Sequence, residues 1–329
     1  MHSGQVVARG VVSLACAFLV ACGQSPHGPQ EKYFFLVSNS KSPFWEQVSK
    51  GLNQAAHDLN VTVSFTGPDT YNPEGEKAEF KRIAALKPAG ILVSVGDPKL
   101  LAEEINAAVA AGIPVIAVDS DAIESKRLFF VGTNNYEAGQ IGGRAAAKAL
   151  NGKGNVVAFR FEGQTNMEER LNGYKSVFAQ YPQIKLIEVI DIKGNPVIAF
   201  DKTKEFLEKK KPEIDAFISM DGESAKEVAE VLKRENAKKV VIATDTLAPT
   251  LEGIESGWIT ATVAQKPYTM GYTSLRLIAD LNLNKLPSLD MDFAGNPHSP
   301  LPRFVDTGVT LIDKSNLAAY RESNSAAAH

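Results

Sequence analysis

The chain has 329 residues, 44% of them apolar and 22% charged, and a formal net charge of −3 at pH 7. This composition excludes a largely disordered chain and provides enough apolar side chains for one large core or two ordinary ones. The only concentrated run of basic residues is KKK at 209–211, so nucleic acid is not expected as a partner.

The amino terminus has the pattern of an export signal. Arg9 precedes an apolar run over residues 10–21 that is too short to span a bilayer but long enough for the core of a signal peptide. The run ends in LVAC at 19–22, which resembles the lipobox of bacterial lipoproteins, where cleavage precedes the cysteine and its thiol takes a diacylglycerol. The resemblance implies a signal peptide over 1–21 and lipidation at Cys22; the alternative is a general secretory signal followed by a chance cysteine.

The cysteine count limits covalent chemistry after cleavage. Cys16 leaves with the signal, so Cys22 has no partner for a disulfide or a thiolate metal site. The next residues, GQSPHGPQEK, contain no apolar side chain, and residues 22–32 are therefore predicted to be an acylated cysteine and flexible tether. Folded structure is expected from Tyr33 onward.

Short apolar runs alternate with helical patterns from Tyr33 onward, as in βαβ units with parallel sheets. Most runs are continuously apolar, which favours strands covered by helices on both faces. The predicted strands are 33–37, 61–65, 90–94, 114–118, 128–131, 155–159, 186–190, 216–219, 240–243 and 259–263. Because one doubly wound sheet of ordinary size has fewer strands, the sequence predicts an α/β protein with two Rossmann-like doubly wound parallel-sheet lobes. The segments GIPVIAVDSD at 112–121 and AKKVVIATDT at 237–246 resemble each other, which supports two similar lobes.

Ligands of open α/β sheets bind beyond the carboxyl ends of the strands, so the first polar residues after each apolar run are the candidate contacts. They are Ser38, Asp69, Asp97, Asp119, Glu162, Asp221, Asp245 and Gln265. The five histidines are scattered along the chain and suggest neither a metal cluster nor a catalytic triad. We therefore expect no enzyme activity, cofactor or metal.

Carboxylates in a closing cleft need donors, which the adjacent hydroxyls of a sugar supply. Phe44 and Trp45 follow the first strand and can cover the C–H face of a sugar ring. The planar guanidinium of Arg170, in NMEERLNGY, can hold oxygens and balance aspartates.

Each of these residues also has a structural interpretation. Asp119 and Asp245 could be helix N-caps or turn residues, and Phe44 or Trp45 could fill the core. Arg170 could form a surface ion pair with Glu168 or Glu169.

Several segments together resemble the ribose- and galactose-type periplasmic sugar-binding proteins, the substrate-binding lipoproteins of ABC transporters. They are VSNSKSPFWEQVSKG at 37–51, AAGIPVIAVDSD at 110–121, VGTNNYEAGQIGGRAA at 131–146, EERLNGYKSVF at 168–178, the long segment 240–272 and FVDTGVTLI at 304–312. The resemblance implies ring stacking by Phe44 and Trp45, a ligand aspartate from each lobe at Asp119 and Asp245, and further contacts from Arg170, Gln265, Ser38 and Ser42. Ser120 stands where the ribose binders have an arginine and Met220 where they have an asparagine, so these positions are predicted to alter the ligand.

The resemblance also implies a periplasmic binding protein type I layout with a three-segment hinge. The N-terminal lobe would comprise 33–133 and 265–295, and the C-terminal lobe 134–264 and 303–313. The chain would cross near 133–135, near 264–265 and at 296–302, leaving 314–329 as a C-terminal tail. The Pro-rich segment 286–303 is interpreted as an irregular hinge connection.

The predicted function is capture of a small hydroxyl-rich ligand, most simply a monosaccharide, by hinge closure and its delivery to an ABC permease. The protein would be a monomer, lipid-anchored on the periplasmic or cell-surface side of a bacterial membrane. Alternatives are a ligand-presenting sensor for a membrane receptor, or a binder of a furanosyl signalling molecule, a cyclic polyol or an amine. A repressor would need a basic helix-turn-helix at its amino terminus, and an oxidoreductase a G-x-G-x-x-G turn after its first strand; neither is present.

Overall fold

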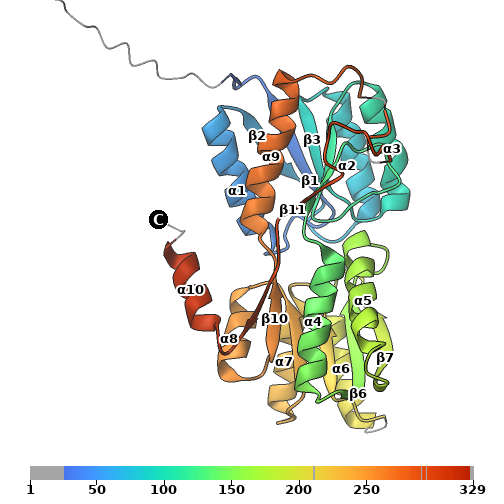
Figure 1. Ribbon diagram of the computed structural model, residues 1–329, viewed down its shortest axis with the longest axis vertical. Coiled ribbons are helices and arrows are strands. Elements are labelled where there is room, and N and C mark those ends of the chain that lie inside the picture. Colours follow the sequence, from blue (N-terminus) through green and yellow to red (C-terminus); the bar gives the residue numbers. More distant parts are fainter. Residues whose placement is uncertain (1–25, 210–211, 290, 294, 327–329) are drawn as a thin grey trace, which may run out of the picture.

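The computed structural model describes residues 26–209, 212–289, 291–293 and 295–326. They form two α/β lobes stacked end to end (Figure 1). The signal segment and Cys22 lie outside the described residues. Within the described part of the chain, none of the helices combines the length and apolar character that crossing a bilayer requires.

The N-terminal lobe is built on a parallel sheet with the strand order β11-β5-β4-β3-β1-β2. Its strands are β1 (Lys32–Val37), β2 (Thr62–Thr66), β3 (Gly90–Ser94), β4 (Val115–Val118), β5 (Phe130–Gly132) and β11 (Phe304–Asp306). Its helices are α1 (Trp45–Leu59), α2 (Pro73–Ala85), α3 (Pro98–Ala110) and α9 (Pro267–Leu283). The pair α1 and α9 covers one face and the pair α2 and α3 the other, which leaves every residue of β3 buried.

The C-terminal lobe repeats this plan with the order β12-β10-β9-β8-β6-β7, in which only the edge strand β12 is antiparallel. Its strands are β6 (Lys153–Arg160), β7 (Gln183–Asp191), β8 (Ala216–Ser219), β9 (Val240–Thr244), β10 (Ala261–Ala264) and β12 (Thr310–Asp313). Its helices are α4 (Asn135–Ala149), α5 (Thr165–Phe178), α6 (Val197–Lys209), α7 (Ser224–Arg234), α8 (Ala248–Ser256) and α10 (Leu317–Ala326). The fold class predicted from the sequence is confirmed.

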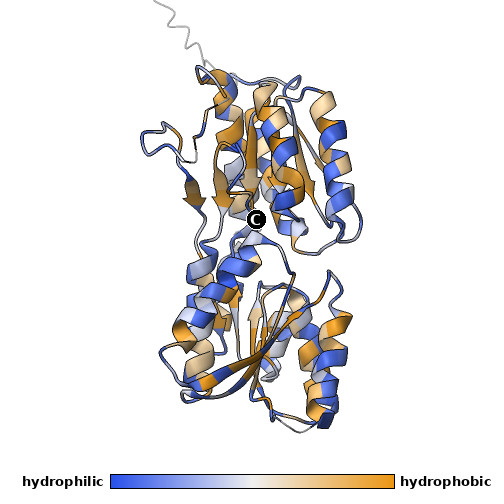
Figure 2. Cartoon of the chain, turned by 90° about the vertical axis from the view of Figure 1, so that its right-hand side faces the viewer, coloured by the Kyte–Doolittle hydropathy of each residue, from blue (hydrophilic) through white to orange (hydrophobic). Residues whose placement is uncertain are grey.

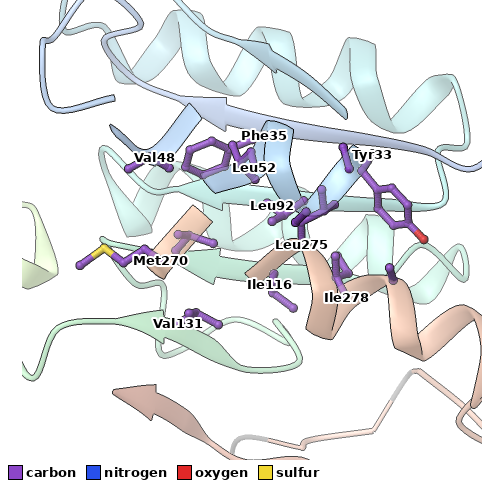
Figure 3. Packing of buried hydrophobic residues seen from close by; sticks show 14 of the residues in the cluster. Tyr33, Phe35, Val48, Leu52, Leu92, Ile116, Val131, Met270, Leu275 and Ile278 are labelled. Atoms are coloured by element: carbon purple, nitrogen blue, oxygen red, sulfur yellow. The ribbon is translucent and has the colours of Figure 1, made fainter. Parts of the chain in front are cut away.

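All ten predicted strands are present, with ends shifted by a few residues. Two further strands, β11 and β12, were not predicted from the sequence; they are short and lie in the carboxyl-terminal region after the Pro-rich segment. Figure 2 shows the strands as apolar ribbons between helices with one polar face. In the N-terminal lobe, Leu275 and Ile278 of α9 pack against Leu92 and Ile116 of the sheet (Figure 3). Burial of such side chains contributes about 1.5–3 kcal/mol each and holds α9 against the sheet.

The hinge consists of three chain crossings, and the third differs from the prediction. Residues 304–306 form β11, which pairs in parallel with β5 of the N-terminal lobe, so the chain crosses between β11 and β12 and not at 296–302. The segment 286–303 instead packs on the N-terminal lobe through Phe293 and Leu301. Its prolines suggested an irregular linker, but its apolar side chains pack against the hydrophobic core of the N-terminal lobe.

The three crossings are joined by hydrogen bonds. The hydroxyl of Thr133 donates to Oε1 of Gln265 at 2.8 Å. The carboxylate of Asp306 accepts from the amides of Asn134 at 3.2 Å and Gly308 at 2.9 Å. The hinge strands therefore lie side by side at one edge of the molecule.

The tether prediction is wrong for residues 26–31. His27 is 5% exposed and its ring contacts the carboxylate of Glu31 at 3.0 Å, while Thr62 donates to the carbonyl of Pro29 at 3.1 Å. The polar composition suggested a flexible segment, but the segment forms a hydrogen bond with Thr62 of the N-terminal lobe. At the other end of the chain, the predicted tail contains α10, whose Tyr320 donates to Thr246 at 2.9 Å.

Candidate functional site

A cavity of about 60 Å³ lies between the lobes, at the carboxyl ends of their strands. Nine residues predicted from the sequence line it: Ser38, Ser42, Phe44, Trp45, Asp119, Arg170, Asp221, Asp245 and Gln265. The wall also contains Asn39, Ser94, Phe161, Gln164, Asn166, Met167, Gly222 and Glu223, which the sequence analysis did not select. The structure thus brings most of the predicted contacts together around one space.

Asp119 and Asp245 occupy equivalent positions in the two lobes. Each follows its strand in the left-handed conformation, with φ of 67°, a region where Asp and Asn are tolerated better than most residues. The amide of Asp119 donates to Val131 at 3.0 Å and that of Asp245 to Val263 at 2.9 Å. Neither residue is a helix N-cap. The similarity of 112–121 to 237–246 therefore reflects two copies of one turn that directs a carboxylate into the cavity.

Both carboxylates are buried, and each accepts hydrogen bonds within the wall. Asp119 accepts from the hydroxyl of Ser94 at 3.2 Å and from the amide of Asn166 at 3.4 Å. Asp245 accepts from the amide of Gln265 at 2.8 Å. Because Asn166 belongs to the C-terminal lobe and Asp119 to the N-terminal lobe, the first aspartate already contacts both lobes.

Arg170 is the cation of the cavity, and its surface-pair interpretation is wrong because it is only 3% exposed. Its Nε donates to Asn135 at 2.9 Å and its Nη1 to the carbonyl of Met220 at 2.6 Å. Its Nη2 is buried without a hydrogen-bond partner among the described residues. The close approach of α4 to α5 sets this position, since a side chain on Gly139 would lie 2.0 Å from the carbonyl oxygen of Arg170.

The pKa values of the aspartates are set mainly by burial. Burial raises the pKa of Asp119 to about 6, with the charge of Arg170 opposing the rise and that of Asp245 adding to it. Burial also raises the pKa of Asp245, while Arg170 and the hydrogen bond from Gln265 lower it. A ligand that donates hydrogen bonds to these carboxylates favours their ionised forms.

The two aromatic residues serve the core and the cavity together. Trp45 is 6% exposed and its ring lies 5.6 Å from Phe35, edge to face. Its indole N–H donates to Asn39 at 3.0 Å. Phe44 is half-buried, with its ring 4.9 Å from that of Trp45. Trp45 therefore fills the core, as one interpretation of the sequence proposed, and the rings of both Phe44 and Trp45 line the cavity.

Three predicted contacts are placed differently from the expectation. Asp221 lines the cavity, but its carboxylate accepts from the amides of Glu223 and Ser224 at 2.8 Å, which fixes the turn before α7. Ser120 and Met220 do not reach the cavity. Ser120 is 1% exposed, with its amide on the carbonyl of Val118, and the side chain of Met220 packs into the apolar core beneath α5. Both side chains therefore lie behind the cavity wall and do not line the cavity.

The lobes touch around the cavity rim. The hydroxyl of Ser42 donates to Glu223 at 3.0 Å, and that of Thr165 to the carbonyl of Asp121 at 2.8 Å. The rings of Tyr71 and Phe161 stack across the cleft at 5.4 Å. The structure is thus a closed arrangement of the two lobes.

Glu76 is a buried carboxylic acid behind the N-terminal wall. It accepts from the amide of Gly96 at 2.9 Å, and Gly96 lies against Ser38 in the loop after β3. Burial raises the pKa of Glu76 to about 8, and the charge of Asp97 adds to the rise. The group is therefore protonated in the folded protein at neutral pH, whereas in the unfolded chain it ionises near its ordinary value of 4.5.

Glu76→Gln is expected to stabilise the protein at high pH. Because the folded pKa is raised, the wild-type free energy of unfolding falls as the pH rises from about 4.5 to about 8, and glutamine lacks this ionisation. At pH 8 the variant should be more stable by about 1–3 kcal/mol, and at pH 4.5 the gain should vanish. Urea unfolding at both pH values measures the difference. Glu74→Gln, on the same helix turn but exposed, is the control, and an equal gain in the two variants would contradict the assignment.

The described residues contain no group of three or more His, Cys, Asp or Glu side chains arranged to hold a metal ion. Fold, hinge and the interlobe cavity with its paired carboxylates define a two-lobed solute-binding protein. The model of the periplasmic binding protein domain family matches residues 33–285, and the chain belongs to this family.

Several known proteins are similar to this chain over most of its length. The D-allose-binding periplasmic protein of Escherichia coli strain K12 is 26% identical over 262 residues, which cover 76% of this chain and 84% of that protein. A glucose-galactose binding protein from Geobacillus stearothermophilus is 29% identical, with a TM-score of 0.78, and the match covers 87% of this chain and 98% of that one. The sugar-binding protein of a sugar ABC transporter from Bacillus halodurans is 32% identical, with a TM-score of 0.77 and coverage of 88% and 100%. These relatives are solute-binding proteins rather than enzymes, and the family implies an extracytoplasmic location.

Proposed function

We propose that this protein captures a monosaccharide between its lobes and delivers it to an ABC permease. The observation that carries the proposal is the unfilled hydrogen-bonding capacity of the cavity. Nη2 of Arg170 and Oδ1 of Asn166 are both buried without a partner among the described residues, next to the carboxylate of Asp119. A sugar offers donors and acceptors on adjacent carbons and can satisfy all of these groups at once.

The size of the cavity favours a small ligand. One water needs about 10–15 Å³ by this measure, so about 60 Å³ corresponds to a few waters or one compact ring. The rings of Phe44 and Trp45 supply apolar surface for the C–H face. The names of the relatives, which bind allose, glucose and galactose, support a monosaccharide as the ligand class.

Closure provides the mechanism. Asp119 comes from the N-terminal lobe, and Arg170 and Asp245 come from the C-terminal lobe, so a ligand that contacts all three has a higher affinity for the closed form. This difference in affinity shifts the population toward closure. A permease that recognises the closed form then receives only loaded protein.

The location and partner are part of the same proposal. Lipidation at Cys22 would hold the protein near the membrane that contains the permease. Co-purification of the membrane-anchored protein with a permease supports delivery, whereas co-purification with a receptor kinase would favour a sensor.

Sugar affinity is expected to fall in acid. Burial between the closed lobes raises the pKa of Asp119 to about 6, and a hydroxyl donates a stronger hydrogen bond to the ionised carboxylate than to the protonated carboxyl. Above pH 7 the affinity should be constant, and below pH 6 it should fall by up to about tenfold per pH unit. Calorimetry at pH 5 and pH 7.5 measures this. An affinity that rises in acid would contradict the role of Asp119.

The proposal is tested by titrating the purified protein with pentoses, hexoses, inositols and amines. A tight ligand stabilises the folded state by about 2.7 kcal/mol at 100 times its Kd, so the melting temperature rises and calorimetry then gives the Kd. At least one monosaccharide should bind with a Kd in the micromolar range or below. If none raises the melting temperature, the proposed ligand class is wrong; a response to amines alone would assign the carboxylates to a cationic ligand.

A further inference from the structure

A second and larger cavity adjoins the first. It has a volume of about 380 Å³ and lies between the start of α1 above and the starts of α7 and α8 below. Five residues line both spaces: Phe44, Gly222, Glu223, Asp245 and Gln265. We refer to the larger space as the outer groove and to the smaller one as the inner cavity.

Both lobes build the outer groove, and its walls are largely apolar. Pro43 and Pro267 come from the N-terminal lobe, and Leu247 and Pro249 come from the C-terminal lobe. Glu46 and Lys226 are exposed residues of its lining, one from each lobe. A lining that mixes apolar surface with a few polar groups is typical of small-molecule sites.

One buried polar group of the groove lacks a partner. Thr250, in the first turn of α8, lines the outer groove and is 1% exposed. Its hydroxyl oxygen has no hydrogen-bond partner among the described residues. A buried hydroxyl without a partner destabilises the structure, and a hydrogen-bonding ligand group in the groove would remove this cost.

We propose that the outer groove binds the substituent of a glycoside whose sugar ring occupies the inner cavity. The five shared residues place the two spaces next to each other, so a substituent on a ring in the inner cavity can extend into the outer groove. This inference rests on the proposed function, because it takes the ring in the inner cavity as given. It adds that the natural ligand is larger than a free monosaccharide and carries a substituent at its anomeric carbon.

The test compares a bound monosaccharide with its propyl and phenyl glycosides, both anomers of each, by calorimetry. At least one glycoside should bind about tenfold more tightly than the free sugar, because its substituent buries apolar surface. Ala248→Phe fills the outer groove from an exposed position that does not line the inner cavity. This variant should remove the gain of the glycoside and leave the affinity for the free sugar unchanged.

Ala107→Phe, on an exposed position of α3 outside the linings of both spaces, is the matched control and should change neither affinity. If the free sugar binds and every glycoside binds more weakly, the inference is overturned while the proposed function stands. An equal effect of Ala248→Phe and Ala107→Phe would overturn it as well. If neither the sugar nor any glycoside binds, the proposed function itself fails.

Discussion

Replacing Arg170 by methionine is expected to lower the affinity for the bound monosaccharide by at least about 100-fold. The substitution keeps most of the volume of the side chain and removes Nη2, which is buried without a hydrogen-bond partner among the described residues and is expected to bind the sugar. It also removes the charge that opposes the raised pKa values of Asp119 and Asp245, so both carboxyls become poorer acceptors at neutral pH. Calorimetric titration at pH 7.5 measures the loss.

The control for this variant is Arg234→Met, which removes an exposed arginine that pairs with Glu230 on α7. Arg170 also donates to Asn135 and to the carbonyl of Met220, so the melting temperature of each variant is recorded beside its affinity. A folded Arg170→Met protein that binds sugar as tightly as wild type would remove Arg170 from the site.

The second large effect is expected for Asp119→Asn and Asp245→Asn. Asparagine suits the left-handed backbone at both positions, with φ of 67°, so each variant changes the charge without straining the turn. Each substitution should weaken sugar binding by about 2–4 kcal/mol. Charge-assisted hydrogen bonds to the carboxylate are replaced by ordinary ones, and the new asparagine side chain has an N–H donor without a partner. The unfolding temperature should stay equal or rise, because burial penalises both charges.

Asp69→Asn provides the comparison for these variants. Asp69 follows β2 as Asp119 follows β4, but its side chain is 77% exposed, so affinity should not change. Tight binding by the double variant Asp119→Asn, Asp245→Asn would show that the carboxylates do not hold the ligand.

The sequence predicted the fold because continuously apolar runs such as 90–94 and 216–219 alternate with helical patterns, as in parallel sheets covered by helices on both faces. It predicted Asp119, Asp245 and Gln265 because the carboxyl end of a parallel strand is where ligands bind. It missed Ser94 and Asn166 for different reasons. Ser94 is the last residue of the apolar run that forms β3, so it was counted as part of the strand. Asn166 lies on α5, one turn before Arg170. Its helical spacing from that arginine was the only indication in the sequence that it lies at the site.

The predictions of the tether and of the third hinge crossing were wrong because they used residue composition, which does not show which residues pair in the folded chain. Polar residues 26–31 were predicted to be flexible, but the hydrogen bond from Thr62 to the carbonyl of Pro29 depends on a folded lobe that composition does not reveal. The hinge was placed at 296–302 because prolines favour linkers, whereas β11 is fixed by parallel pairing with β5, in which Phe304 lies opposite Phe130. Long-range pairing of three-residue strands leaves little periodic pattern in the sequence.

A crystal structure of the protein with its tightest-binding monosaccharide would locate the ligand directly. We expect the ring in the inner cavity, with hydroxyls donating to Asp119 and Asp245, an oxygen accepting from Nη2 of Arg170, and Phe44 or Trp45 against the C–H face. A sugar bound outside the inner cavity, or one in it that contacts neither aspartate, would contradict the central claim.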